Sequence, residues 1–316
     1  MPEIAGVGTT GIKATTDRAA ILALDADCVI FASTMFADGQ HVLKEHDDDI
    51  EALLRSGKNV ISVSGYIWPA VRGTDVEARL AAACEAGQVS LYGAGINPGY
   101  MLERVGPLAT ALCQRVDRVS VLENWDARNY PSPEVLFAGI GMGLPDGALT
   151  EDHPGLVMIG NWFNESLTYT ANRLGAELEG YHRSLEYGLA TRDIDLPTGT
   201  IAKGTVAAIA QTWSGLVDAK PLVSVTDRWV VDWDIPGFGE ERDHYWQVEV
   251  EGTPGVRCRF DFTDTYPPNP MAPNDRLTAG TTAATAVNAI ADVCAATAGI
   301  VRLSSFGTCK VIGDSP

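Results

Sequence analysis

Residues 59–94 read NVISVSGYIWPAVRGTDVEARLAAACEAGQVSLYGA, and this stretch decides the fold class. Its two ends, 59–65 and 89–94, are short apolar runs of the kind that form strands buried on both faces of a parallel sheet. Between them, residues 74–87 have the apolar spacing of a helix. The order strand, helix, strand therefore predicts a right-handed crossover unit with parallel strands.

The same alternation extends toward the N-terminus. Residues 27–33, DCVIFAS, form another apolar run, and residues 41–56 place apolar side chains at helical spacing. Gly57 follows that helix directly, where a residue without a side chain is favoured. Three strands alternating with two helices predict an α/β unit built on a parallel sheet.

Beyond residue 115 the pattern changes. Residues 116–124, VDRVSVLEN, predict a strand, and the later chain contains many short β-like segments separated by Gly, Pro and Asp. One of them, around 251–255, is typical of a hairpin. We therefore expect an α+β domain over residues 116–316 whose sheet is mainly antiparallel, following a first domain over residues 1–115.

Helical patterns also occur in this second part. Two helix-like stretches lie at 132–142 and 155–174, and an Ala-rich helix is expected at 278–299. This last helix is a candidate to pack on the first domain.

Charge and composition limit the function. The 316 residues include 23 Lys and Arg against 41 Asp and Glu, which gives a formal net charge of −18. A surface this acidic repels phosphate backbones and anionic lipid headgroups, so neither nucleic acid nor a membrane is an expected partner. Because no long apolar run or basic leader is visible, we expect a cytoplasmic protein.

Cysteine and histidine spacing disfavours metal or disulfide chemistry. The six cysteines are scattered without a C-x-x-C pair, which is typical of reduced, buried thiols. The five histidines show no spacing that suits a metal ion, so no metal site is expected. A G-x-S-x-G nucleophile motif is also absent from the sequence.

Residues 6–11, GVGTTG, match the G-x-G-x-x-G dinucleotide motif. That motif works when a strand leads into the glycine turn and a helix begins at once. Here only MPEIA precedes the motif, and the next helical pattern begins near Thr16 or Asp17. We therefore interpret it as a glycine-rich surface turn.

Residues 92–100, YGAGINPGY, follow a buried strand and precede a helix. Ligands of open α/β sheets bind at the carboxyl ends of the strands, so Asn97 is placed to present its amide to a ligand. The same residues are equally typical of a turn and helix cap.

The order of these motifs resembles that of a known family. ALDADCVIFAST (23–34), RSGKNVIS (55–62), GAGINPGY (93–100) and GTIAKGTVAAIAQTWSGLVDAKPLV (199–223) are similar to segments of the dihydrodipicolinate-reductase-like oxidoreductases. The similarity is greatest with the branch of 2,4-diaminopentanoate dehydrogenase and the amine dehydrogenases. It implies an N-terminal Rossmann domain for NAD or NADP and a C-terminal domain that forms the substrate pocket and a homodimer contact.

The resemblance also implies site residues. Ser33 and Thr34 match the end of a strand beside the cofactor, and Asn97, Pro98 and Gly99 match the loop near the nicotinamide and the substrate. Asn97 is thus a candidate to orient the substrate or the nicotinamide. Tyr66 and Tyr100, expected at strand ends near the cleft, are candidates to supply a proton.

Three further residues are candidates for the substrate pocket. Asn124 and Asp126 belong to the ENWD segment that ends the strand entering the second domain, and His182 lies in a predicted strand. For His182, a surface position is the commoner alternative for an isolated histidine in a strand.

Two departures from the family pattern are visible. The resemblance implies that the first βαβ unit, which carries the pyrophosphate loop, is missing from this chain, so that the expected parallel sheet is a partial Rossmann-type sheet. The amine dehydrogenases also carry a glutamate just after the NVIS-type strand, whereas residues 63–66 here read VSGY. Amine chemistry that depends on that glutamate is therefore not supported.

The sequence thus favours an NAD(P)-dependent oxidoreductase that transfers a hydride to or from a small carbonyl, imine or amine compound. The alternative is a non-catalytic dimeric binding or scaffold protein that keeps the fold without the phosphate loop.

Overall fold

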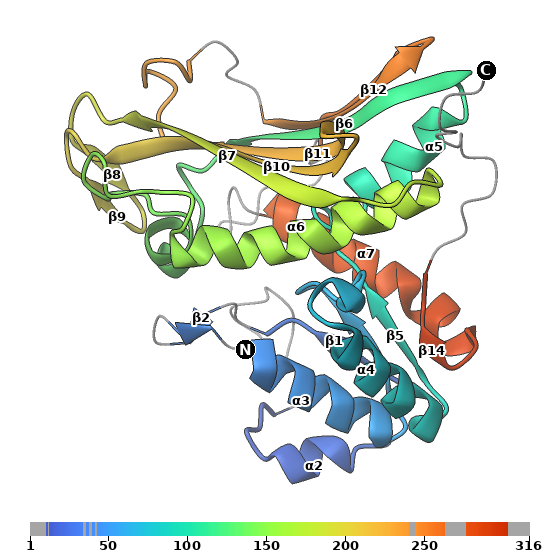
Figure 1. Cartoon of the computed structure of the whole chain (residues 1–316). Helices are drawn as coiled ribbons and strands as arrows, with labels where there is room; N and C mark the ends of the chain where they lie inside the picture. The colour runs from blue at the N-terminus through green and yellow to red at the C-terminus, as the bar shows by residue number, and fades with distance from the viewer. Residues whose placement is uncertain are drawn as a thin grey trace.

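The computed structural model describes residues 11, 13–33, 36, 37, 40, 41, 43–239, 244–262 and 276–302. They form two main β-sheets with helices between them: a small parallel sheet at the bottom of Figure 1 and a large sheet at the top. The mixed architecture confirms the expected fold class, a partial parallel sheet followed by a mainly antiparallel one.

The small sheet has four parallel strands in the order β1-β4-β5-β14. The strands are β1 (Cys28–Phe31), β4 (Asn59–Ser62), β5 (Ser90–Gly93) and β14 (Gly299–Ile300). The helices near this sheet are α2 (Arg18–Leu22), α3 (Leu43–Arg55), α4 (Thr74–Gly87) and α7 (Arg276–Ala295). Two short strands, β2 (Phe36–Ala37) and β3 (Gln40–His41), pair with each other.

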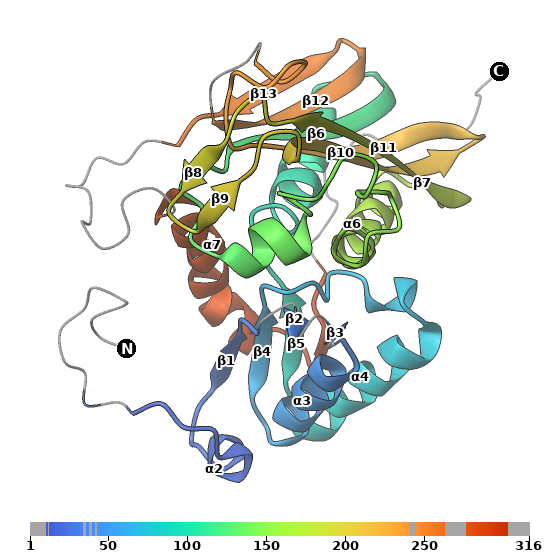
Figure 2. The same ribbon diagram turned by 90° about the vertical axis from the view of Figure 1, so that its left-hand side faces the viewer.

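Both faces of the small sheet are covered, which explains its continuous apolar strands. Val60 and Leu91 pack toward α3 and α4, in a cluster that includes Leu54. The alternate residues Ile61 and Tyr92 pack against α7. Figure 2 shows α7 and the pair α3 and α4 on opposite sides of these strands.

The predicted stop at Gly57 agrees with the structure. Helix α3 ends at Arg55, and Gly57 has φ +84°, a left-handed conformation that a residue with a side chain rarely adopts.

The large sheet has six strands in the order β13-β12-β6-β11-β10-β7. They are β6 (Arg115–Asp126), β7 (Gly180–Leu189), β10 (Val206–Val217), β11 (Lys220–Val230), β12 (Tyr245–Thr253) and β13 (Val256–Phe260). Only the β6–β11 pair is parallel. The hairpin expected around 251–255 is the β12–β13 connection. A separate small pair is formed by β8 (Ile194–Leu196) and β9 (Gly199–Ile201).

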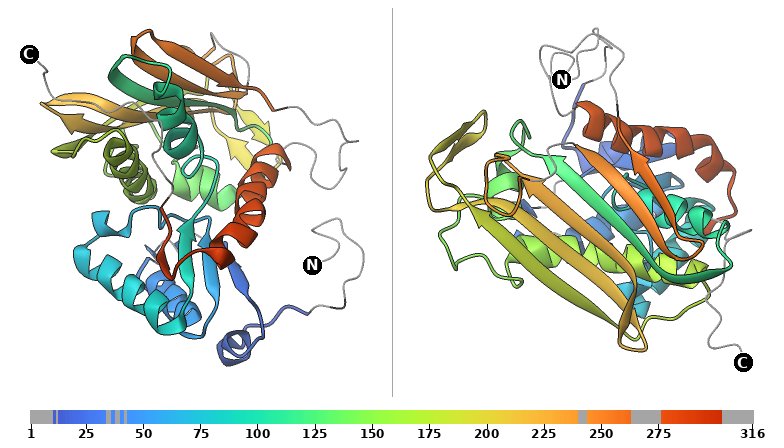
Figure 3. Two further views of the ribbon diagram at one scale, coloured as in Figure 1. Left: turned by 90° about the vertical axis from the view of Figure 1, so that its right-hand side faces the viewer. Right: turned by 90° about the horizontal axis from the view of Figure 1, so that it is seen from above.

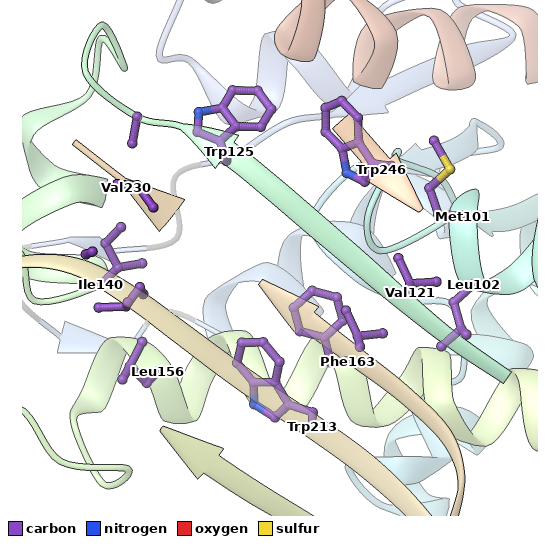
Figure 4. Packing of buried hydrophobic residues seen from close by; sticks show 14 of the residues in the cluster. Met101, Leu102, Val121, Trp125, Ile140, Leu156, Phe163, Trp213, Val230 and Trp246 are labelled. Atoms are coloured by element: carbon purple, nitrogen blue, oxygen red, sulfur yellow. The ribbon is translucent and has the colours of Figure 1, made fainter. Parts of the chain in front are cut away.

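Helix α6 (Pro154–Arg173) covers the inner face of the large sheet. Its Phe163 lies against Trp213 of β10, with ring centroids 4.5 Å apart, as Figure 4 shows. In the view from above, the right panel of Figure 3, the strands lie in front of the helices. All helices that the structure describes next to this sheet therefore pack on its inner face.

Two predicted helices differ from the structure. Residues 101–114 form a π-helical turn, η2 (Met101–Val105), followed by the short α5 (Gly106–Thr110). Pro107, which has no N–H to donate, lies in the first turn of α5, where the π-helical hydrogen bonds of η2 give way to α-helical ones. Residues 132–142 contain another π-helical turn, η3 (Glu134–Gly139), and a short 3₁₀ turn, η1 (Pro69–Val71), follows β4.

The cysteines are less buried than expected. Cys84 and Cys113 are buried, whereas Cys28 and Cys258 are half-buried and Cys294 is exposed. Among the residues that the structure describes, no helix is long and apolar enough to cross a membrane.

Candidate functional site

A cavity of about 180 Å³ lies between the loop after β5, the inner face of the large sheet and helix α6. This is far more than the roughly 15 Å³ that one water needs, so the cavity can hold a small organic molecule. Its walls are mostly apolar and indole side chains. They comprise Ile96, Asn97, Pro98, Glu123, Tyr130, Val135, Ile140, Leu156, Ile159, Trp162, Phe163, Ile209, Gln211, Trp213, Asp227, Trp229 and Thr282.

The loop after β5 positions Asn97 at this cavity. Gly99 has φ +124°, and a Cβ there would lie 2.5 Å from the backbone nitrogen of Gly95, so only glycine lets the loop close this tightly. The amide Nδ2 of Asn97 donates to Glu123 Oε2 at 2.8 Å and to Asp227 Oδ1 at 3.0 Å. One side chain from the parallel-sheet unit thus bridges two carboxylates of the large sheet.

Glu123 and Asp227, which we call the acid pair, are direct neighbours in the sheet. Strands β6 and β11 pair in parallel with Glu123 opposite Asp227. On the inner face, each strand presents valines before its carboxylate and a tryptophan after it. Along these two strands, the other inward-facing neighbours of the acid pair are therefore apolar or indole side chains.

Hydrogen bonds distinguish the two carboxylates. Glu123 also accepts the indole N–H of Trp229 and that of Trp246, each at 3.0 Å. These bonds favour its ionised form, but burial is the stronger effect and raises the pKa of Glu123. For Asp227, burial and then the nearby Glu123 carboxylate raise the pKa well above its ordinary value, against the bond from Asn97. Two interacting carboxyl groups titrate together, and the Glu123 carboxylate adds to burial in raising the pKa of Asp227.

The charge around the acid pair is not compensated by a cation. No Lys, Arg or His is among the described residues that line the cavity. Hydrogen-bond donors surround Glu123, but they carry no full charge. The arrangement can therefore accept a proton from a bound ligand or pair with a cationic group on it.

The predicted catalytic and cofactor residues lie in different places. Asn97 and Pro98 line the cavity. Tyr100 lines a neighbouring cavity of about 370 Å³ that shares Ile96 with the first. The Tyr66 hydroxyl is buried and donates to Asp47 Oδ1 at 2.7 Å, and burial raises the pKa of this phenol. Ser33 is exposed, and its carbonyl accepts from Ser64 Oγ at 3.4 Å, while Thr34 lies outside the described residues.

None of the three predicted pocket residues lines the cavity. Along β6, Asn124 and Asp126 alternate with the inward-facing Glu123 and Trp125. Their side chains therefore project from the outer face of the sheet, away from the cavity. Asn124 accepts from Arg228, and Asp126 pairs with Arg128. His182 is exposed on β7 opposite Ser214.

Sequence reasoning missed the acid pair, although a signal was available. VSVLENW (119–125) and VSVTDRW (223–229) share the same valines, serine and tryptophan, with an acidic residue at the fifth position. In the structure the two segments pair residue by residue. A carboxylate at an inward position of an apolar alternation would have been a stronger candidate than the adjacent Asn124.

The end of the parallel sheet suits the nicotinamide end of NAD(P). Asn97 Oδ1 and Trp162 Nε1 are both buried, and neither has a hydrogen-bond partner within the described part of the chain. The first is an acceptor and the second a donor, and a carboxamide needs one of each. Trp162 packs directly on Gly65, just after β4. The G-x-G-x-x-G stretch lies outside the described residues except for Gly11, and no group of three or more His, Cys, Asp or Glu in the described part could hold a metal ion.

Comparisons with known proteins agree with this architecture. The sequence is 28% identical to an amine dehydrogenase of Streptomyces virginiae over 272 residues, covering 80% of this chain and 71% of that protein. The fold is similar to that of an amine dehydrogenase from Mycobacterium smegmatis, with a TM-score of 0.70 and 18% identity over 95% of this chain and 82% of that one. A probable dehydrogenase from Thermotoga maritima has a TM-score of 0.50 and 14% identity over 97% and 80% of the two chains.

No protein-family model matches the sequence. The similarities define the class: the chain has the fold of the Rossmann-type oxidoreductases, and its relatives support an oxidoreductase. The dihydrodipicolinate-reductase-like assignment stays a prediction.

Proposed function

We propose that the protein is an NAD(P)-dependent oxidoreductase that interconverts a small amine and the corresponding imine or carbonyl compound. The observation that carries this proposal is the acid pair, placed in an apolar cavity without a compensating cation. A protonated amine supplies the missing positive charge, and its carbon substituents suit the indole and aliphatic walls. A neutral ketone alone would supply no positive charge to pair with the acid pair.

The residues that line the cavity have different roles in the proposed reaction. The acid pair takes a proton from the bound ammonium group, a transfer supported by the raised pKa of both carboxyl groups. Asn97 holds the two carboxylates together, and the tryptophans of the cavity keep the pair dry. The nicotinamide, when bound, exchanges a hydride with the carbon that carries the nitrogen. Oxidation consumes one protonated amine, one water and one oxidised cofactor, and it yields a carbonyl compound, ammonium, reduced cofactor and one proton.

The acid pair takes the place of the glutamate that the sequence resemblance locates just after the NVIS-type strand. Residues 63–66, after β4, contain no glutamate. Here the acidic groups come from β6 and β11, on the opposite side of the cavity from the parallel sheet. The relatives' description as amine dehydrogenases supports the same substrate class.

The test is a spectrophotometric assay with the purified chain. NAD+ and NADP+ reduction is followed at alkaline pH with butan-2-amine and a set of other small primary amines, each paired with the alcohol of equal shape. The reverse reaction uses the ketones with and without ammonium. We expect amine-dependent reduction that the alcohols do not support, and ketone reduction that requires ammonium.

Cofactor binding separates this proposal from its alternative. NADH and NADPH are titrated by fluorescence against the wild-type chain. Saturable binding together with turnover of amines supports the proposal. No binding up to millimolar cofactor contradicts it and favours the non-catalytic binding or scaffold protein.

A further inference from the structure

Gln211 extends the acid pair into a row of three polar side chains across the sheet. It lies on β10 opposite Asp227 of β11, which in turn lies opposite Glu123 of β6. The residue is fully buried and lines the cavity. On its own strand the inward-facing neighbours are Ile209 and Trp213, so a glutamine here interrupts an apolar surface.

The amide of Gln211 has no hydrogen-bond partner among the residues that the structure describes. Both Oε1 and Nε2 are buried and unpaired, unlike Asn97, whose Nδ2 has two acceptors. Burying an amide with both atoms unpaired destabilises the free protein, and a leucine of similar size would avoid the loss. A polar side chain kept under these conditions is suited to a ligand that supplies the missing partners.

The chemistry of the cavity defines that ligand group. Gln211 offers one acceptor and two N–H donors, which a hydroxyl or a carboxamide can match simultaneously. A carboxylate would need a cation, and the described lining has none; it would also face the acid pair. Neighbouring strands lie about 5 Å apart, so the two recognised groups of the ligand are separated by about three bonds.

We propose that Gln211 binds a neutral polar group of the substrate, either a hydroxyl on the carbon next to the amine carbon or a carboxamide attached to the amine carbon. This inference rests on the proposed function and narrows its substrate class to small amino alcohols and amino amides. Gln211 is then a specificity-determining residue rather than part of the proton transfer.

The test uses pairs of amines of equal shape. The first pair is 2-aminopropan-1-ol and butan-2-amine; the second is alaninamide and 3-methylbutan-2-amine. Dissociation constants are measured by tryptophan fluorescence without cofactor, because Trp162, Trp213 and Trp229 line the cavity. The variants are Q211L and the matched control Q247L, since Gln247 on β12 is half-buried and does not line the cavity. kcat/KM for the same amines gives a second reading.

We expect the wild type to prefer the polar member of each pair by about 10- to 100-fold, since an unmet buried amide carries a cost of that size. Q211L should lose or reverse this preference while its melting temperature stays equal or rises, and Q247L should keep it. Equal preference in the wild type and Q211L, with saturable binding of butan-2-amine, would overturn the role of Gln211 and leave the proposed function standing. Failure of all four amines to bind or react would overturn both.

Discussion

Two buried carboxylate clusters of this molecule are built differently. In the first, Arg72 bonds Asp47 at 2.9 and 3.0 Å and Glu165 at 3.1 Å, and we call it the arginine-bridged cluster. The second is the acid pair, whose partners are amide and indole N–H groups. The first joins α3 and the segment after β4 to α6, whereas the second faces a cavity. In the arginine-bridged cluster the guanidinium neutralises the carboxylates and stabilises the fold. In the acid pair no guanidinium of the described cavity lining does so, and the negative charge is available to a ligand.

Replacing Asp227 by asparagine should have the largest effect on activity. D227N mimics the protonated acid and keeps the acceptor for Asn97, but it can take no proton from a bound ammonium. Amine oxidation should fall by about 10²- to 10⁴-fold in kcat/KM, the range of general acid–base catalysis. D152N, which changes an exposed aspartate, is the control. Activity of D227N within threefold of wild type would show that the acid pair takes no part in proton transfer.

The arginine-bridged cluster should respond in stability instead. R72M leaves Asp47 and the fully buried Glu165 without their cation. The free energy of unfolding should fall by about 3–5 kcal/mol, the usual cost of removing one partner of a buried ion pair. Denaturant unfolding measures this, with R79M as a control because Arg79 is partly exposed. Equal unfolding free energies for both variants would remove the distinction between the clusters.

Asn97 links the acid pair to the parallel sheet, and N97A should have an intermediate effect. The substitution removes an N–H donor shared by both carboxylates, so kcat/KM should fall by about 10- to 100-fold. Because that donor favours the ionised forms, the pH at which activity appears should also move upward. The pH profile is compared with that of N129A, an exposed asparagine. An unshifted profile would contradict the bridging role.

The smallest expected effect is a pH dependence of stability. Folding raises the pKa of Asp227, so the stability that its protonated form contributes is lost as the pH rises from about its unfolded value of 3.8 through the folded pKa. Asparagine does not titrate, and the Tm difference between D227N and wild type should therefore increase with pH. Each pKa unit corresponds to about 1.4 kcal/mol, or about 2–3 °C in Tm. Thermal melts between pH 4 and 9 measure it, and a difference that decreases with pH would contradict the raised pKa of Asp227.

The parallel sheet could be predicted because its information is local. Apolar runs such as 59–62 and 90–93 are continuous when both faces are buried, and Gly57 marks a helix end by its own conformation. The π-helical turns could not be read from apolar spacing, since residues 101–105 keep helical periodicity up to Gly106 and Pro107.

The site was only partly predictable for a related reason. Asn97 belongs to a local motif after a strand, and it does line the cavity. Glu123 and Asp227 meet only because β6 and β11 pair in parallel, which no short segment specifies. Asn124 was predicted instead of its neighbour Glu123. In a strand, a shift of one residue moves a side chain to the other face of the sheet, so the predicted lining of a cavity depends on the exact position.

The most direct test of the central claim compares an amine and an alcohol of the same shape in the cavity. Dissociation constants of butan-2-amine and butan-2-ol are measured by tryptophan fluorescence at neutral pH, where the amine carries a charge. The uncompensated acid pair predicts that the amine binds at least about tenfold more tightly. Equal affinities for the two compounds would contradict the claim that the acid pair recognises a cation.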